Sequence, residues 1–505
     1  MSIFKNNKIP RRSFIKGISL TSLTGLAGAS AGYFISGAPS AWAKSTHSRP
    51  LQNPPQEAAV DGLLRVSINA KYGNFELMDQ QTYLRCFDNQ PVGRTLRVKA
   101  GDTIRLSLHN KLPYDPLQEI CTSIPTEEDN TPRGFNVTNM HVHGVHVSPK
   151  SPADNIFTLV RFQESEQYIY NIPKDHPPGT YFYHAHFHGS VALQVASGMA
   201  GALIIEGPID DVPEIKACKE QVLCFQTPRF DSEGLCENYD LLSEQGAILI
   251  NGQYKPVITM KQGEVQRWRM VNASHMANMQ FNVQAHEVTA LCFDGNPLEE
   301  SRIQNQIVMV PGNRADILIK AKATGTYAIY SEPVTGSDTE AEKEAKRLAS
   351  LVIEPQQLDM PLFQGNLPRP NLLNNINKDE ITFGRRLEFG LSGAADGNKY
   401  TINGEPFSCL NPWQIPLGAV EEWEVYNHTA ESHPFHIHVN PFQMISGGDV
   451  EPGTWLDTVN LAPFSRIRFR TRFEDYTGTF VFHCHNLTHE DLGMMQAVEV
   501  ISPIS

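Results

Sequence analysis

The sequence has little positive charge and few long apolar runs. Its 42 lysines and arginines are outnumbered by 55 aspartates and glutamates, which gives a formal net charge of −13. Because nucleic-acid binding depends on basic side chains that neutralise phosphates, this balance argues against a nucleic-acid partner. After the N-terminal region, no stretch approaches the ~18 apolar residues that a membrane-spanning helix requires. The acidic surplus is therefore interpreted first as a solubility feature.

Methionine and cysteine are scarce as well. The 13 methionines form no dense run, and the nearest approach to one, residues 275–279, is interpreted as core packing rather than as a soft-metal site. One of the eight cysteines is assigned to a metal below, and the seven that remain are an odd number, which excludes complete internal pairing. One disulfide among Cys218, Cys224 and Cys236 is expected in an oxidising compartment, and the sequence leaves the pair open.

Glycine and proline are plentiful, with 36 and 34 copies in 505 residues. Charged residues make up 19% of the chain and hydrophobic residues 40%, which is typical of a globular protein. The frequent turn residues favour many short strands joined by turns. The length corresponds to about three domains of ~150 residues each.

The N-terminus has the features of an export signal. Residues 11–16 form a twin-arginine pattern, residues 17–35 are weakly apolar, and residues 41–43 have the small-x-small form of a cleavage site. Residues 1–43 are therefore expected to be a removed signal peptide, so that the mature protein begins near Lys44, and the alternative is an uncleaved anchor. The pattern predicts export by the twin-arginine translocation machinery to the periplasm or another exported location.

Two motifs recur three times along the chain in the same order. The first runs from Gly to Asn with alternating polar and apolar residues, and its copies are residues 101–110, 263–272 and 418–427. Such alternation indicates a strand with one buried face. The second begins with Gly-Thr, and its copies are residues 179–183, 325–329 and 478–482. The repetition predicts an all-β chain of three tandem β-sandwich domains, placed at residues 50–208, 209–370 and 371–505.

Domains 1 and 3 each carry two His-x-His pairs, whereas domain 2 has no histidine at the equivalent positions. The four pairs are His141 with His143, His184 with His186, His436 with His438, and His483 with His485. Residues i and i+2 of a strand project from one face, so each pair can present two imidazoles in the same direction. Eight imidazoles from two domains can then meet at one interface. Since imidazole suits copper, zinc, iron and nickel, the pattern favours a metal cluster over ordinary core histidines.

Cys484 lies between two of these histidines, so its side chain points to the opposite face of the strand. His433, His489 and Met494 are its candidate partners there. A thiolate, two imidazoles and a weak axial methionine form the ligand set of a blue-copper electron-transfer site. The competing interpretation of Met494 is a core methionine. Because the two neighbours of Cys484 belong to the other cluster, the backbone joins two redox sites covalently.

These residues resemble the copper motifs of the multicopper oxidases, a family of laccase-like enzymes. The motifs are residues 141–144, 184–186, 433–438 and 483–494, and the resemblance extends over about Leu63 to Val500. It implies three tandem cupredoxin-like Greek-key β-sandwich domains. It also implies four copper ions per chain, of which one is type 1, one is type 2 and two are type 3.

The resemblance assigns each copper its ligands by motif position. It implies a type 1 copper held by His433, Cys484 and His489, with Met494 as axial ligand. It implies a type 2 copper held by His141 and His436. It implies a type 3 pair held by His143, His184, His186, His438, His483 and His485. His146 and His188 lie close to these ligands in the sequence and are expected to be neighbours of ligands or surface residues.

The resemblance also implies a reaction. A small-molecule reductant gives up one electron at a time, here expected at an exposed edge of His433 or His489, and O2 is reduced to two waters with four electrons and four protons. Asp154 and Glu490 are expected to relay protons, and the alternative for both is a hydrogen bond to a loop or to the second ring nitrogen of a ligand. The chain is expected to be a monomer.

The sequence allows several classes of reductant as the substrate. Phenols and aromatic amines are favoured, Fe(II) and Mn(II) are alternatives, and the lack of a methionine-rich insertion weakens Cu(I). The main alternative function is a non-enzymatic exported protein that binds copper or serves a structural role. A structural relative would lack the ligands, and copper storage does not explain two kinds of site. A copper nitrite reductase would be shorter and would lack the four paired-histidine motifs.

Overall fold

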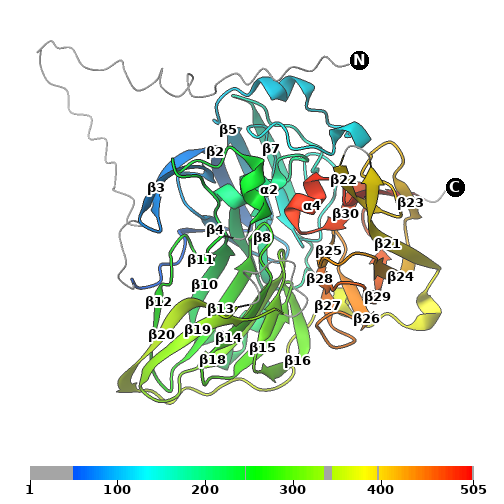
Figure 1. Cartoon of the computed structure of the whole chain (residues 1–505). Helices are drawn as coiled ribbons and strands as arrows, with labels where there is room; N and C mark the ends of the chain where they lie inside the picture. The colour runs from blue at the N-terminus through cyan, green and yellow to red at the C-terminus, as the bar shows by residue number, and fades with distance from the viewer. Residues whose placement is uncertain (1–48, 245, 335–343, 395–396, 503–505) are drawn as a thin grey trace, which may run out of the picture. The chain divides into compact units, whose positions relative to one another are not determined.

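The computed structural model describes residues 49–502 except 245, 335–343, 395 and 396, and this part of the chain is mostly β-structure (Figure 1). The predicted signal peptide, residues 1–43, lies outside the described residues. No helix among the residues that the structure describes is both long and apolar enough to cross a membrane. The strands form six sheets, two from each third of the chain.

The first sandwich consists of a five-stranded sheet in the order β1-β4-β9-β8-β6 and a four-stranded sheet in the order β3-β2-β5-β7. Its strands are β1 (Gln56–Ala58), β2 (Leu63–Leu77), β3 (Gln80–Phe87), β4 (Gly93–Lys99), β5 (Thr103–Asn110), β6 (His141–His143), β7 (Ser165–Asn171), β8 (Gly179–His184) and β9 (Ala200–Glu206). Its helical segments are η1 (Pro116–Ile120), η2 (Glu127–Asp129) and α2 (Val191–Ser197).

The middle sandwich pairs a six-stranded sheet, β11-β10-β13-β18-β15-β16, with a five-stranded sheet, β12-β20-β19-β14-β17. Its strands are β10 (Lys219–Gln226), β11 (Leu249–Ile250), β12 (Val257–Gln262), β13 (Val265–Asn272), β14 (Met279–Val283), β15 (Val288–Phe293), β16 (Asn296–Gln304), β17 (Ile307–Met309), β18 (Arg314–Lys320), β19 (Gly325–Glu332) and β20 (Lys346–Gln357). Short helical segments before and within it are η3 (Pro208–Asp211), α3 (Pro213–Lys216) and η4 (Tyr239–Ser243).

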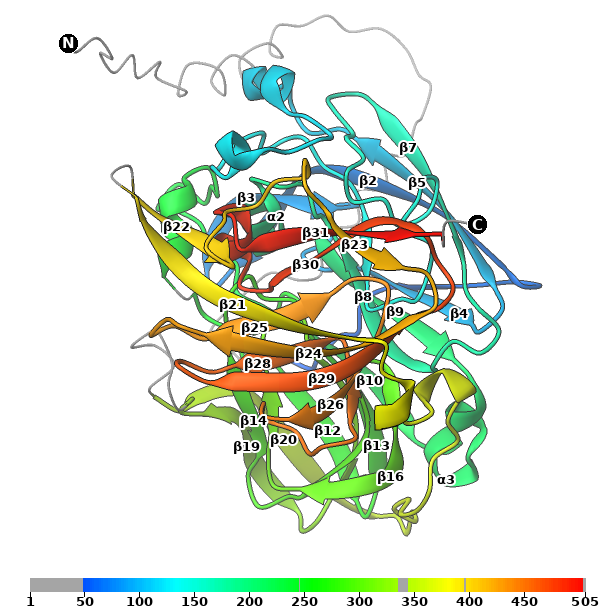
Figure 2. The ribbon, with the colours of Figure 1, turned by 90° about the vertical axis from the view of Figure 1, so that its right-hand side faces the viewer.

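The third sandwich has the sheets β22-β21-β24-β29-β26-β27 and β23-β31-β30-β25-β28. Its strands are β21 (Phe383–Ala394), β22 (Gly397–Ile402), β23 (Trp413–Pro416), β24 (Ala419–Asn427), β25 (His433–Ile437), β26 (Phe442–Ser446), β27 (Trp455–Leu456), β28 (Thr458–Leu461), β29 (Arg466–Phe473), β30 (Gly478–Cys484) and β31 (Met495–Ile501). Its helical segments are η6 (Asn371–Leu373), η7 (Lys378–Glu380) and α4 (Leu487–Asp491). In Figure 2, β21, β24 and β29 of this sandwich run side by side.

The predicted repeats occupy equivalent strands in all three sandwiches. The copies of the first motif are β5, β13 and β24, and each pairs in parallel with one strand and antiparallel with another. The copies of the second motif are β8, β19 and β30, each antiparallel to both of its neighbours. The prediction of three repeated all-β sandwiches is therefore confirmed, because one hydrogen-bonding pattern occurs three times.

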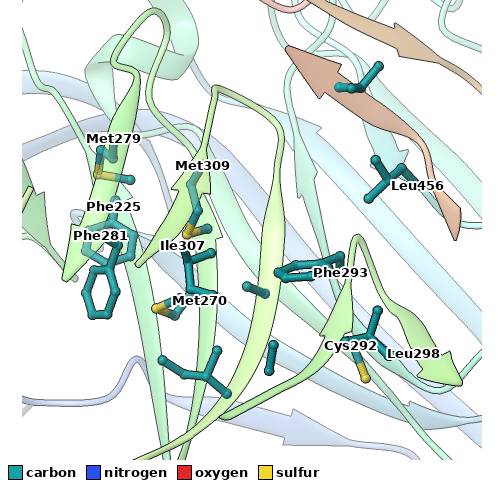
Figure 3. Close-up of a cluster of buried hydrophobic side chains, with 14 of the residues drawn as sticks. Phe225, Met270, Met279, Phe281, Cys292, Phe293, Leu298, Ile307, Met309 and Leu456 are labelled. Atoms are coloured by element: carbon teal, nitrogen blue, oxygen red, sulfur yellow. The ribbon is translucent and has the colours of Figure 1, made fainter. Parts of the chain in front are cut away.

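Apolar side chains fill the space between the sheets of the middle sandwich. Phe225, Met270 and Phe281 are buried there together with Met279 (Figure 3). Met279 belongs to the 275–279 segment, and its place in this core agrees with packing rather than with a soft-metal site. The same core continues into the third sandwich, where Leu456 of β27 lies beyond β15 and β16.

The cysteines do not pair. None of the eight, which all lie within the described residues, forms a disulfide, and six of them are buried. The disulfide expected among Cys218, Cys224 and Cys236 is therefore wrong for this structure. Cys224 lies inside strand β10 in an apolar cluster, and Cys236 lies in a different cluster, so burial rather than cross-linking accounts for both.

Candidate metal centres

Neighbouring strands bring the histidine pairs together within each sandwich. In the first sandwich β6 runs antiparallel to β8, with His141 opposite His184. In the third sandwich β25 runs antiparallel to β30, with His436 opposite His483. In the middle sandwich the equivalent strands, β14 and β19, pair in the same way without any histidine. The same antiparallel strand pair thus occurs in all three sandwiches, and it carries histidines only in the first and the third.

The eight imidazoles from the first and third sandwiches form one buried cluster. Each of these residues is at most 1% exposed. Rings from the two sandwiches stack directly, since the centroids of His141 and His438 are 3.9 Å apart and those of His143 and His436 are 3.8 Å apart. The structure therefore places the four predicted pairs at a single interface.

The cluster divides into groups that the sequence alone did not separate. Within a group, the possible ligand atoms all lie within 4.8 Å of one another. One group is His143, His184 and His485, and a second is His186, His438 and His483. A third contains His141 and His436 and shares His143 with the first group. Six histidines thus form two sets of three, and the remaining two lie beside them.

The distances between ring nitrogens fit metal ions. His483 Nε2 lies 3.3 Å from His186 Nε2 and 3.2 Å from His438 Nε2, and His485 Nε2 lies 3.2 Å from His143 Nδ1. Two nitrogens bound to one tetrahedral metal at ~2.0 Å are about 3.3 Å apart. Within the described part of the cluster, four buried ring nitrogens have no hydrogen-bond partner, and these also fit metal ligands: Nε2 of His141, His184 and His436, and Nδ1 of His485.

In several of these imidazoles, the ring nitrogen that points away from the cluster contacts an oxygen atom. His141 Nδ1 lies 2.8 Å from a carboxylate oxygen of Asp154. Three further Nδ1 atoms lie 2.9 to 3.1 Å from backbone carbonyl oxygens, and these belong to His184, His436 and His483. The contacts with carbonyl oxygens require the N–H on Nδ1, so in these three rings Nε2 is left with its lone pair toward the cluster. Burial lowers the pKa of His184 and His186 to about 3, which keeps both rings neutral, as ligands must be.

The two predicted relay carboxylates both touch the cluster. Asp154 accepts from the backbone N–H of Val142 at 3.0 Å in addition to its contact with His141. Glu490 of α4 lies 3.0 Å from His483 Nδ1 and 3.5 Å from His186 Nδ1. Burial raises the pKa of Asp154 to about 8 and that of Glu490 to about 7. Both carboxyl groups can therefore hold or release a proton near neutral pH.

A second site lies on the opposite face of β30. Cys484 Sγ is 3.5 Å from His433 Nδ1 and 3.7 Å from His489 Nδ1, and the two nitrogens are 3.1 Å apart. All three side chains are buried, and their ligand atoms form one group. Met494 is fully buried, and its backbone carbonyl accepts from Cys484 N at 3.0 Å. A thiolate with two imidazoles fits a copper ion better than a hard oxygen-binding cation.

Among the candidate ligands of the Cys484 site, all of which are buried, only His489 keeps a small exposed edge. His489 is 7% exposed, whereas His433 is 0% exposed. The ring of Tyr400 stacks on His489 with centroids 4.0 Å apart, and Tyr400 Oη donates to Glu431 at 2.9 Å. A carboxylate oxygen of Glu431 also lies 3.6 Å from His489 Nε2, and this side chain is 36% exposed. Sequence analysis missed Tyr400 and Glu431, although Glu431 stands only two residues before His433.

The remaining histidines near the motifs contact other groups. His146 Nδ1 lies 2.8 Å from the carbonyl of Val439, and its Nε2 lies 2.8 Å from Asp475. His188 Nε2 lies 2.9 Å from Asn130 Oδ1. Both are buried, and neither belongs to the groups of possible metal ligands found among the described residues.

Several known proteins have sequences related to that of this chain. Three family models, each described as multicopper oxidase, match residues 133–210, 231–355 and 380–503, together more than half of the chain. The multicopper oxidase mco of Staphylococcus aureus is 26% identical over 438 residues, which cover 82% of this chain and 83% of that protein. The laccase of Bacillus subtilis is 24% identical over 81% of this chain and 89% of that protein.

Solved structures share the fold. A multicopper oxidase from Campylobacter jejuni, described as a metallo-oxidase, matches with a TM-score of 0.75 and 24% identity, over 90% of this chain and 96% of that one. The McoA multicopper oxidase of Aquifex aeolicus matches with a TM-score of 0.74 and 24% identity, over 90% of this chain and 99% of that one. The three sandwiches are therefore cupredoxin-like domains.

Proposed function

We propose, from the premise that this chain belongs to the multicopper oxidase family and is a copper-dependent oxidoreductase, that it couples one-electron oxidation of small reductants to the four-electron reduction of O2 to water. The observation that carries this proposal is the place of Cys484. Its thiol belongs to one buried site, and the residues on either side of it, His483 and His485, belong to the other. An electron that arrives at the thiol has a path of a few covalent bonds to the histidine cluster.

The donor sets favour four copper ions in two kinds of site. We assign a type 1 copper to His433, Cys484 and His489 with Met494 as axial ligand, and a type 2 copper to His141 and His436. The type 3 pair is assigned to the two sets of three histidines described above. Bound copper would supply the one-electron redox chemistry and the binding of O2. The chain itself contributes neutral imidazoles in fixed tautomers and a buried space that excludes bulk water.

The exposed edge of His489 supports electron entry on that side rather than at His433. A phenol or an aromatic amine can donate an O–H or N–H hydrogen bond to Glu431 while its ring lies next to Tyr400 and His489. We therefore propose phenols and aromatic amines as the first substrate class. A metal-ion reductant is the second candidate, because the same Glu431 carboxylate can bind a cation.

Replacing Glu431 by glutamine tests this entry site. Loss of a charged hydrogen-bond acceptor is expected to raise KM for phenolic and amine donors by about 10- to 100-fold, with little change in the visible spectrum. A matched control is Glu388→Gln, because that carboxylate lies 3.7 Å from His428, which is not a candidate ligand. Equal KM values in the two variants would place electron entry elsewhere.

We further propose that Glu490 and Asp154 carry protons to the histidine cluster. Their contacts with His483, His186 and His141 put carboxyl oxygens at the outer nitrogens of the ligands. These contacts also fit the alternative, in which the carboxylates only orient the rings. The two roles differ in kinetics, because a relay limits proton delivery whereas an orienting group affects metal retention.

Glu490→Gln is expected to keep the copper content and to lower kcat for O2 reduction by about 10²-fold or more. The neighbouring Asp491→Asn is the control, since Asp491 is equally buried but accepts from the backbone N–H groups of Gly189, Val191 and Ala192. Measuring kcat in H2O and D2O as a function of pH separates the roles. A relay predicts an altered solvent isotope effect in Glu490→Gln alone, and an unchanged isotope effect together with lost copper would leave only the orienting role.

Export and assembly are proposed from the sequence. The twin-arginine pattern at residues 11–16 supports translocation as a folded protein, removal of residues 1–43 and a periplasmic or other exported location. We retain 50–208, 209–370 and 371–505 as the domain boundaries and a monomer as the assembly. N-terminal sequencing of the exported protein should give a start near Lys44, and an intact Met1 would contradict the signal.

Oxygen uptake by the copper-loaded protein tests the proposed function as a whole. A phenolic donor is expected to support uptake, and Cu(I), Fe(II) and Mn(II) are compared with it at equal concentration. A chain that binds copper but consumes no O2 with any of these donors would favour copper binding or a structural role instead.

A further inference from the structure

The middle sandwich has no histidine motif, yet one of its loops reaches the histidine cluster. This loop joins β17 to β18, and Gly312 within it has φ of 91°. A Cβ atom at Gly312 would lie 3.0 Å from Cγ and Cδ2 of His485 and 3.1 Å from Cε1 of His143. Such contacts are tighter than ordinary packing, so the bare backbone of Gly312 lies directly against two rings of one ligand group.

Two residues later the same loop contributes Arg314, the first residue of β18. Its guanidinium is fully buried and binds both carboxylate oxygens of Asp457, with N–O distances of 2.8 and 2.5 Å. It also donates to the carbonyl oxygens of Gly312 at 2.8 Å, Asp294 at 3.0 Å and Thr180 at 3.3 Å. Five contacts fix the plane of the guanidinium, and a bidentate pair fixes the carboxylate in turn.

Asp457 in turn contacts two histidines of the cluster. Its carboxylate lies 3.1 Å from His143 Nε2 and 3.5 Å from His436 Nδ1, and its backbone carbonyl accepts from His436 Nδ1 at 2.9 Å. His143 comes from the first sandwich and His436 from the third. With Nε2 of His143 held by Asp457, Nδ1 of His143 is left to face His485. One carboxylate from the β27–β28 region thus orients rings from two sandwiches.

The glycine of the first copper motif has a role in the same arrangement. Gly144 follows His143 and has φ of 80°. A Cβ atom at this position would overlap the Arg314 guanidinium and the Asp457 carboxylate. Gly144 therefore leaves the space in which the ion pair approaches the cluster.

We infer that Arg314, contributed by the sandwich that holds no copper ligand, is a positioning residue for the histidine cluster and acts through Asp457 on His143 and His436. This inference rests on the proposed function for the identity of the metal. The competing explanation is an ion pair that only ties the sandwiches together. Arg267 of β13 provides that comparison, because it is also buried and binds Asp210 and Asp316 at 2.6 Å each, with no candidate ligand among these partners.

Copper content and spectra of matched variants distinguish the two explanations. In Arg314→Gln, the affinity of the histidine cluster for copper is expected to fall by about 10- to 100-fold. A loss of this size is typical when a group that orients a metal ligand through hydrogen bonds is removed. The visible absorption of the Cys484 site per protein is expected to stay unchanged. The type 2 electron paramagnetic resonance signal is expected to weaken or shift, and Arg314→Lys is expected to restore part of it. Arg267→Gln is expected to retain the wild-type copper content and signal.

Asp457→Asn keeps the shape of the side chain and provides the test if Arg314→Gln does not fold. It is expected to reproduce the selective loss at the histidine cluster. The inference is overturned if folded Arg314 and Asp457 variants keep wild-type copper content and the type 2 signal, or if Arg267→Gln shows the same loss. Wild-type protein that binds no copper would instead overturn the proposed function, so the two failures are distinguishable.

Discussion

Cys484→Ser is expected to remove the visible absorption of the copper-loaded protein and to end oxidation of every donor. The blue absorption of such a site depends on the bond between copper and a thiolate, and a serine hydroxyl does not provide it. Cys484 is also the covalent connection between the Cys484 site and the histidine cluster. Activity should therefore fall by far more than the ~100-fold that can result from losing a hydrogen-bond partner of a metal ligand.

Cys224→Ser is the matched control for this prediction. Cys224 is buried in the middle sandwich and belongs to none of the groups of possible ligands among the described residues. Its variant should remain blue and active, with at most a loss of stability from placing a hydroxyl in an apolar cluster. A Cys484→Ser protein that is still blue, or a Cys224→Ser protein that is colourless, would refute the assignment of the thiolate.

His186→Ala is expected to give a protein that is blue but does not turn over. His186 belongs to the set with His438 and His483, and His483 Nε2 lies within 3.3 Å of Nε2 of the other two. Removing one of three imidazoles should empty or weaken that copper position while the Cys484 site stays intact on the other face of β30. A phenolic donor should then bleach the blue colour by one electron, and O2 should not restore it.

His188→Ala provides the comparison. His188 lies only two residues after His186 in the sequence, but its Nε2 contacts Asn130 Oδ1 instead of another histidine. That variant should bleach with the donor and become blue again in air, as the wild type should. Stopped-flow absorption measures both steps. Reoxidation of His186→Ala at the wild-type rate would show that His186 is not needed for the reaction with O2.

The repeat pattern made most of the fold predictable. Alternating residues in three copies predicted β5, β13 and β24, since burial of one face alone requires a period of two. β5 and β24 follow this pattern, whereas every residue of β13 is buried, because Arg267 and Arg269 on its polar face pair with Asp316. The loss of histidines from the middle copy was equally visible, since repeated strands can be aligned without a structure. The predicted disulfide was wrong because nearness in sequence says nothing about which apolar cluster a cysteine enters.

The ligand assignments relied on short motifs, and motifs have limits that the structure makes clear. The sequence could not divide the six type 3 histidines, because the two sets of three combine residues about 40 to 340 positions apart. Tyr400, Asp457 and Arg314 lie on strands or loops without a histidine, and only tertiary contacts reveal them. The choice between His433 and His489 as electron entry likewise depended on exposure, which no motif encodes.

The most direct test of the central claim is the number of electrons taken from a one-electron donor for each O2 consumed by the copper-loaded wild-type protein, measured with hydrogen peroxide in the same solution. Transfer from the Cys484 site to the histidine cluster predicts four electrons for each O2 and no peroxide. Two electrons for each O2 with an equal amount of peroxide, or donor oxidation without O2 uptake, would contradict the account.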